Sequence, residues 1–156
     1  MNTQRWEKLE IMARNRRDDH FKVVTHLLQQ EAEQLNQMSQ LSDMICDYQS
    51  QLRELQSQPH KPSQAISLYQ FIARVEEFKN STEGRLDTIR AKIREAQTKL
   101  VNLEKERLKF SSLQSKATVL SNKRAAIEEE KQQEQVIVNR YARTASDFGT
   151  AFANDN

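Results

Sequence analysis

The stretch LQSQPHKPS, residues 55–63, holds both prolines of the chain, Pro59 and Pro62. Proline lacks a backbone N–H and clashes with the preceding helical turn, and it pushes the residue before it out of the α region. One helix is therefore expected to end near Gln56 and a second to begin near Ser63, whose hydroxyl is placed to cap the second helix. The stretch predicts a tight turn between two helices.

Apolar residues before the turn repeat at alternating steps of three and four, which is the heptad pattern of a coiled coil. They are Met38, Leu41, Ile45, Tyr48, Leu52 and Leu55. Further upstream Val24, Leu28 and Leu35 continue the stripe, interrupted by Glu31. The two successive steps of three from Leu35 through Met38 to Leu41 predict a locally overwound coil.

The heptad pattern resumes after the turn and is strongest from Leu86 to Leu103, where every seam position is apolar. The residues between 79 and 84 form a weak patch within one helix, because a single helical glycine such as Gly84 costs only about 1 kcal/mol relative to alanine. A diluted stripe continues from Leu113 to about Arg143.

These patterns predict an all-α fold, an antiparallel two-helix coiled-coil hairpin with unequal arms. Residues 1–143 form the hairpin, with one helix over about 4–56, a turn over 57–63 and a second helix over about 64–143; residues 144–156 are expected to be a disordered tail. At 1.5 Å per residue the two helices would span roughly 80 and 120 Å. The last part of the longer helix must then extend past the N-terminus or fold onto a partner.

Composition supports helix and excludes most other folds. Among 156 residues there are only 2 glycines and 2 prolines, too few for a barrel, a sandwich or a nucleotide-binding loop. Apolar residues make up 37%, and the mean hydropathy is -0.86, so the apolar side chains must lie along a narrow seam. A net charge of +2 gives no strong field for nucleic acid.

The chain shows no segment that suggests secretion or membrane insertion. It has no apolar run of about 20 residues and no signal-peptide pattern at its start. The single cysteine, Cys46, permits no internal disulfide and favours a reducing compartment. We therefore expect a cytoplasmic protein that reaches the inner face of the cell membrane only through its partners.

Catalysis is not expected, because a two-helix coil has almost no interior in which polar groups could converge. His20 and His26 are six residues apart and fit no metal-binding pattern, and Cys46 has no histidine one turn away to activate it. We predict no catalytic residue, no metal and no cofactor. The first helix has a basic start, which is either a phosphate-binding patch or, with better support, a solvated face; it consists of Arg5, Lys8, Arg14, Arg16 and Arg17.

Apolar residues near the turn exceed what a two-helix seam can bury. Phe71 and Phe78, seven residues apart, form a second stripe beside Leu68, Ile72 and Val75. Such a stripe indicates a partner, or else a wider core made with a third helix or a second copy of the chain.

The residues that flank the turn resemble a known family. The motif DYQ at 47–49, the proline-containing turn, YQFI at 69–72 and VE at 75–76 resemble the FliJ family of flagellar export proteins. The resemblance is concentrated in about 35 residues around the turn. It implies a cytoplasmic component of a type III protein export apparatus, with a role in flagellum biogenesis and motility.

The resemblance also implies partners and a binding face. FliJ-like proteins form a stalk whose terminal arms enter a hexameric export ATPase (FliI-like), whose turn end contacts an export gate protein (FlhA-like), and some escort substrate-specific export chaperones. By position, the gate-contacting face would comprise Ile45, Tyr48, Leu52, Phe71, Val75, Phe78 and Thr82. Two alternatives remain open: a stalk protein of a virulence injectisome, similar to YscO, and a homo-oligomeric coiled-coil scaffold.

Overall fold

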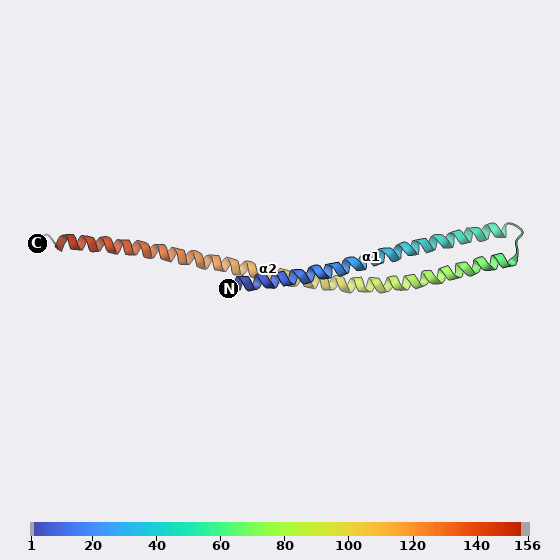
Figure 1. Cartoon of the computed structure of the whole chain (residues 1–156), viewed down its shortest axis with the longest axis horizontal. Coiled ribbons are helices and arrows are strands. Elements are labelled where there is room, and N and C mark those ends of the chain that lie inside the picture. The colour runs from blue at the N-terminus through green and yellow to red at the C-terminus, as the bar shows by residue number, and fades with distance from the viewer. Residues whose placement is uncertain (1, 154–156) are drawn as a thin grey trace. The chain divides into compact units, whose positions relative to one another are not determined.

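The protein consists of two long helices joined by a short turn (Figure 1). The computed structural model describes residues 2–153, with Asn2 and Phe152 described by their backbone only. Helix α1 comprises Asn2–Gln56 and helix α2 comprises Pro62–Ala153; the described residues contain no strand. The two helices pack against each other, which confirms the predicted all-α helical hairpin.

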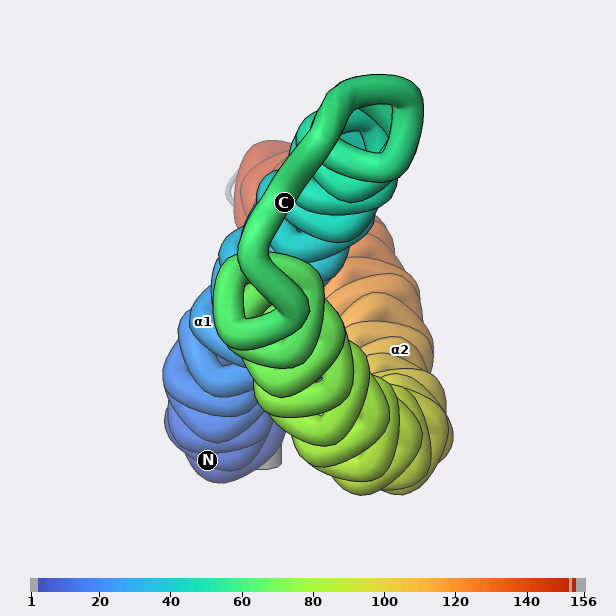
Figure 2. Tube along the Cα trace, turned by 90° about the vertical axis from the view of Figure 1, so that its right-hand side faces the viewer, coloured from blue at the N-terminus to red at the C-terminus, as the bar shows by residue number. Residues whose placement is uncertain are grey.

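The turn lies where the prolines predict it, and Figure 2 looks onto it. At the end of α1 the backbone N–H of Ser57 donates to the carbonyl oxygens of Arg53 and Glu54, at 3.1 and 3.2 Å, and its hydroxyl also donates to Glu54 O at 2.7 Å. These bonds satisfy carbonyls that the end of a helix leaves open. No described residue has a positive φ, so the turn needs no glycine.

The second helix begins at Pro62, two residues before the predicted start at about residue 64, and Ser63 is not its cap. Pro62 is the first residue of α2, a position that suits proline because the N–H it lacks would have no helical partner there. The N–H of Gln64 donates to the carbonyl oxygen of Lys61 at 3.1 Å, and Ser63 lies inside the first turn.

Residues 13–106 form one of two compact units, a helical pair that contains the turn. The centre of this unit is a narrow apolar seam between the helices. Its buried members are Ala13, Val24, Leu41 and Leu52 on α1 and Ile72, Leu86, Ile93 and Ala96 on α2. The strongest heptads of the sequence therefore form the core of this unit.

The seam of α1 keeps its heptad spacing where the sequence predicted overwinding. Leu28 and Leu35 are exposed, and Leu27, Glu31 and Gln34 take the inward positions between Val24 and Met38. The prediction was wrong because it followed the apolar residues, whereas this part of the seam carries polar side chains.

One polar seam residue shows how α1 and α2 align within this unit. The imidazole Nε2 of His20 donates to the carbonyl oxygen of Ala96 at 2.8 Å, across a position where alanine leaves room for the ring. Two heptads closer to the turn on each helix, the same alignment brings Gln34 level with Thr82. Thr82 is fully buried, and the side-chain oxygen Oε1 of Gln34 is buried without a hydrogen-bond partner.

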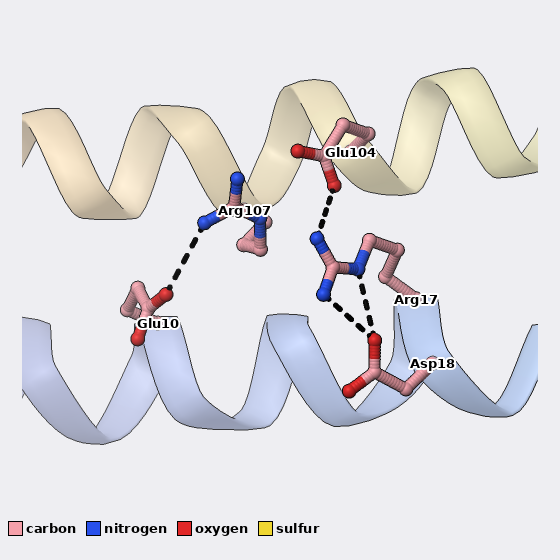
Figure 3. Close-up of polar contacts among 5 residues, drawn as sticks. All are labelled: Glu10, Arg17, Asp18, Glu104 and Arg107. Carbon is pink, nitrogen blue, oxygen red and sulfur yellow. Dashed lines mark hydrogen bonds and ion pairs between the residues drawn. The ribbon is translucent and has the colours of Figure 1, made fainter.

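The other unit combines the first twelve residues with residues 107–156. Trp6 stacks on Phe110 with ring centroids 6.4 Å apart, and the carboxylate of the buried Glu10 lies 3.6 Å from the guanidinium of Arg107 (Figure 3). From Thr118 to Ala151 every residue is exposed.

Helix α2 continues to Ala153, past the predicted end near residue 143. The residues from 144 to 153, predicted as part of a disordered tail, are therefore helical; residues 154–156 lie outside the described part of the chain. Alanines such as Ala145 and Ala151 are good helix formers, which explains why the helix continues through this segment. Neither helix, over the residues described, contains an apolar run that could cross a membrane.

Candidate partner-binding surface beside the turn

Met44, Phe71 and Phe78 form an exposed apolar surface near the turn, which we call the tip stripe. Each of them directly precedes a seam position of its helix. Residues in this position share one flank of the helical pair, as the ion pair between Arg16 and Glu106 at 3.5 Å shows. Four heptads closer to the turn, the same relation places Met44 beside Phe78. Phe71 is 50% exposed and Phe78 is 44% exposed.

Neighbouring side chains hold the two phenylalanine rings of the tip stripe. Tyr48 stacks on Phe71 with a centroid distance of 5.9 Å and an interplanar angle of 17°. The guanidinium carbon of Arg85 lies 5.6 Å from the centroid of the Phe78 ring, a cation–π contact. Rings fixed in this way lose little rotamer freedom when a partner covers them, which favours binding.

Two further apolar side chains of α2 are exposed near the turn. Ile66, which the sequence analysis did not single out, is 55% exposed, and Tyr69 is 53% exposed. The side-chain amide of Gln56 donates to the hydroxyl of Tyr69 at 3.1 Å, which links the end of α1 to the start of α2. This surface can bind the apolar face of another protein.

The structure separates the seven residues predicted to form the gate-contacting face. Phe71 and Phe78 are exposed, and Ile45, Tyr48 and Val75 are partly buried at seam positions. Leu52 and Thr82 are buried between the helices, so neither side chain is available to a partner. Thr82 donates its hydroxyl proton to the carbonyl oxygen of Phe78 at 2.9 Å, which allows its side chain to be buried in the seam.

A second exposed apolar stripe, missed by the sequence analysis, lies on α1. Phe21, Leu28 and Leu35 are spaced by seven residues and all are exposed. Phe21 has no counterpart in the predicted seam, and Leu28 and Leu35 had been assigned to it. The signal that could have found this stripe is its seven-residue spacing. Once Arg17, His20, Glu31 and Gln34 are assigned to the seam, each residue of the stripe directly follows a seam position.

Two arginines of the basic start of α1, Arg16 and Arg17, contact carboxylates within residues 13–106. Arg17 donates through Nη1 to Glu104 at 3.0 Å and through Nη2 to Asp18 at 2.7 Å (Figure 3). The hydrogen bonds to Asp18 and then to Glu104 raise the pKa of the Arg17 guanidinium above its ordinary value. These contacts favour the solvated-face interpretation over a phosphate-binding patch, because the guanidinium already has acidic partners.

The described residues contain no group of histidine, cysteine and acidic side chains that could hold a metal ion. Cys46 is exposed on α1. Comparison of this chain with protein-family models, with curated proteins and with solved structures finds no match. The candidate site is therefore defined by its physical chemistry, an apolar surface with fixed aromatic rings.

Proposed function

We propose that this protein is a non-catalytic component of a flagellar type III protein export apparatus, a stalk-like coiled coil that links an export ATPase ring to an export gate. The observation that carries the proposal is the tip stripe. Its two phenylalanines are exposed within the segment that bears the FliJ-like motif. A pair of aromatic rings held open to solvent is expected to bind another protein.

Each part of the molecule has a role in this proposal. The tip stripe contacts an export gate protein similar to FlhA. The exposed end of α2, from residue 118 onward, enters the ring of a hexameric ATPase similar to FliI. Substrate-specific export chaperones are further partners, and the protein reaches the membrane through the gate alone.

Binding to the gate tests the tip stripe directly. The double substitution Phe71→Ser and Phe78→Ser should weaken binding to the cytoplasmic domain of the gate protein by about tenfold or more. The melting temperature should change little, because both side chains are already exposed. Phe21→Ser is the matched control, since Phe21 is an exposed phenylalanine on a different surface. Unchanged binding by the double variant would refute the role of the tip stripe.

ATPase activity tests the role of the end of α2. The turnover of the export ATPase is measured with the full chain and with a chain that ends at Ala117. Removal of residues 118–156 uncovers no buried side chain among those described, so the shortened chain should keep its helical pair, which circular dichroism checks. Stimulation of ATPase turnover by the full chain but not by the shortened chain supports a stalk. Equal effects of both chains, or none, would contradict it.

The two alternatives make different predictions. An injectisome stalk similar to YscO would stimulate the ATPase of a virulence system in place of the flagellar one. A homo-oligomeric scaffold would bury the tip stripe against a second copy, and Phe71→Ser with Phe78→Ser would then dissociate the oligomer.

A further inference from the structure

The end of α2 has a large apolar surface that the described residues of its own chain leave exposed. Every residue from Thr118 to Ala151 is exposed, and we call residues 118–153 the C-terminal arm. Its exposed large apolar residues are Val119, Leu120, Ile127, Val136, Ile137, Val138, Tyr141 and Phe148. Single long helices with such side chains are marginal in water, so this surface indicates a helical partner.

The apolar residues of the arm include a regular seven-residue series. Leu113 is partly buried, and Leu120, Ile127, Tyr141 and Phe148 follow it at multiples of seven residues. The only polar member of the series among the described residues is Glu134, at its centre. A seven-residue apolar repeat is the signature of a helix that pairs with another helix.

We propose that the C-terminal arm pairs in the antiparallel direction with the C-terminal arm of a second copy of this chain. With Glu134 on the twofold axis, Leu120 of one copy is level with Phe148 of the other, and Ile127 is level with Tyr141. Between Leu120 and Phe148 the series is symmetric about residue 134, so the apolar members of this part meet apolar members and Glu134 meets Glu134 of the other copy.

The charges of the arm favour the antiparallel arrangement. Its acidic block, Glu128 to Glu130, becomes level with residues 138–140, so that Glu128 lies level with Arg140 and the block lies within one turn of Arg143. Asp147 becomes level with Ser121, within one turn of Lys123 and Arg124. A parallel pair would instead place the acidic block beside itself, and like charges across an interface are unfavourable.

The start of α1 leaves room for such a partner. The stacking of Trp6 on Phe110 makes Asn2 level with Gln114, one turn further along each helix. The last described residue of the partner arm, Ala153, would be level with Ser115 when the arms are aligned through residue 134. It would therefore cover α2 from Ser115 onward, beyond the level of Asn2 at the start of α1, without displacing α1.

Sedimentation of the full chain over nanomolar to high micromolar concentrations tests the pairing. The wild type should convert from monomer to dimer. Reversal of the acidic block to lysine (Glu128, Glu129 and Glu130→Lys) should raise the apparent dissociation constant at least tenfold, as should Arg140→Glu with Arg143→Glu. The two sets combined in one chain should restore the dimer. A monomer at every concentration, or a dimer that the arm variants leave unchanged, would overturn the proposal.

Disulfide cross-linking tests the direction of pairing. In a Cys46→Ser background, which removes the exposed native cysteine, Ile127→Cys alone should form no cross-linked dimer. A mixture of Ile127→Cys and Tyr141→Cys chains should cross-link on oxidation, because these positions face each other only in the antiparallel pair. Cross-linking of Ile127→Cys to itself without the mixed product would overturn the arrangement.

The dimer and the proposed entry into an ATPase ring use the same residues, so the arm would separate from the second copy before it entered a ring. Sedimentation and cross-linking use the protein alone, so their outcome does not depend on the proposed function. A dimer that dissociates with the arm variants supports it whether or not an export ATPase responds. A dimer that dissociates only when Phe71 and Phe78 are replaced would overturn it and favour the scaffold alternative.

Discussion

Helix α2 contains two regions with the same kind of sequence pattern and opposite burial. Between residues 65 and 117 a seam face is buried or partly buried, and Leu86 is only 4% exposed. In the C-terminal arm the heptad-spaced Leu120 and Ile127 are about half exposed. A heptad pattern therefore predicts that a helix has a pairing face, and the partner helix decides whether that face is buried.

Replacement of one leucine by alanine in each region should give the largest difference in unfolding free energy between the two regions. Leu86→Ala removes a buried side chain and should lower the free energy of unfolding by about 3 kcal/mol. Leu120→Ala should change it by about 0.5 kcal/mol or less at low protein concentration, because its side chain is already in water. Urea unfolding followed by circular dichroism measures both. Equal losses at low concentration would show that the arm is paired within the monomer.

The buried charges provide the next largest effect. Arg107→Leu leaves the carboxylate of Glu10 buried without this guanidinium and should cost about 2 kcal/mol. Glu10→Leu with Arg107→Leu should recover most of that loss, because leucines suit the seam. In the arm, Glu134→Leu should leave the stability of the monomer nearly unchanged. Failure of the double variant to recover stability would show that the pair is worth more than an apolar replacement.

A stabilising change is expected at Gln34. Its buried Oε1 has no hydrogen-bond partner, so Gln34→Leu removes the cost of desolvating the amide and should raise stability by about 1 kcal/mol. Gln135→Leu in the exposed arm should have no comparable effect on the monomer. Chemical denaturation measures the stability of both variants. A loss of stability in the Gln34→Leu variant would mean that the amide stabilises the seam.

The smallest effect concerns the two glycines, one in each region. A Cβ atom at Gly84 or Gly149 would meet no other atom within 4 Å. Gly84→Ala should stabilise the paired region by about 0.5 to 1 kcal/mol through helix propensity. Gly149→Ala should raise the helical signal of the arm while the global midpoint stays the same. A lower midpoint for Gly84→Ala would show an unrecognised steric conflict.

Much of the candidate surface could be predicted from sequence. The seven-residue spacing of Phe71 and Phe78 indicated a second stripe outside the seam, and both side chains are exposed. Leu52 and Thr82 were placed on the same face by resemblance, and the structure buries them instead. Phe21 was missed because its stripe becomes visible only once Leu28 and Leu35 are removed from the seam.

The sequence alone determined that the protein is two helices joined at Pro59 and Pro62, because proline chemistry and heptad spacing act locally along the chain. Only the tertiary structure decided which polar residues enter the seam. His20 lies inward because Ala96 on the other helix leaves space and a carbonyl oxygen for its ring, and Glu10 lies inward because Arg107 is there to meet it. Such choices depend on residues far away in the sequence, so no local pattern contains them.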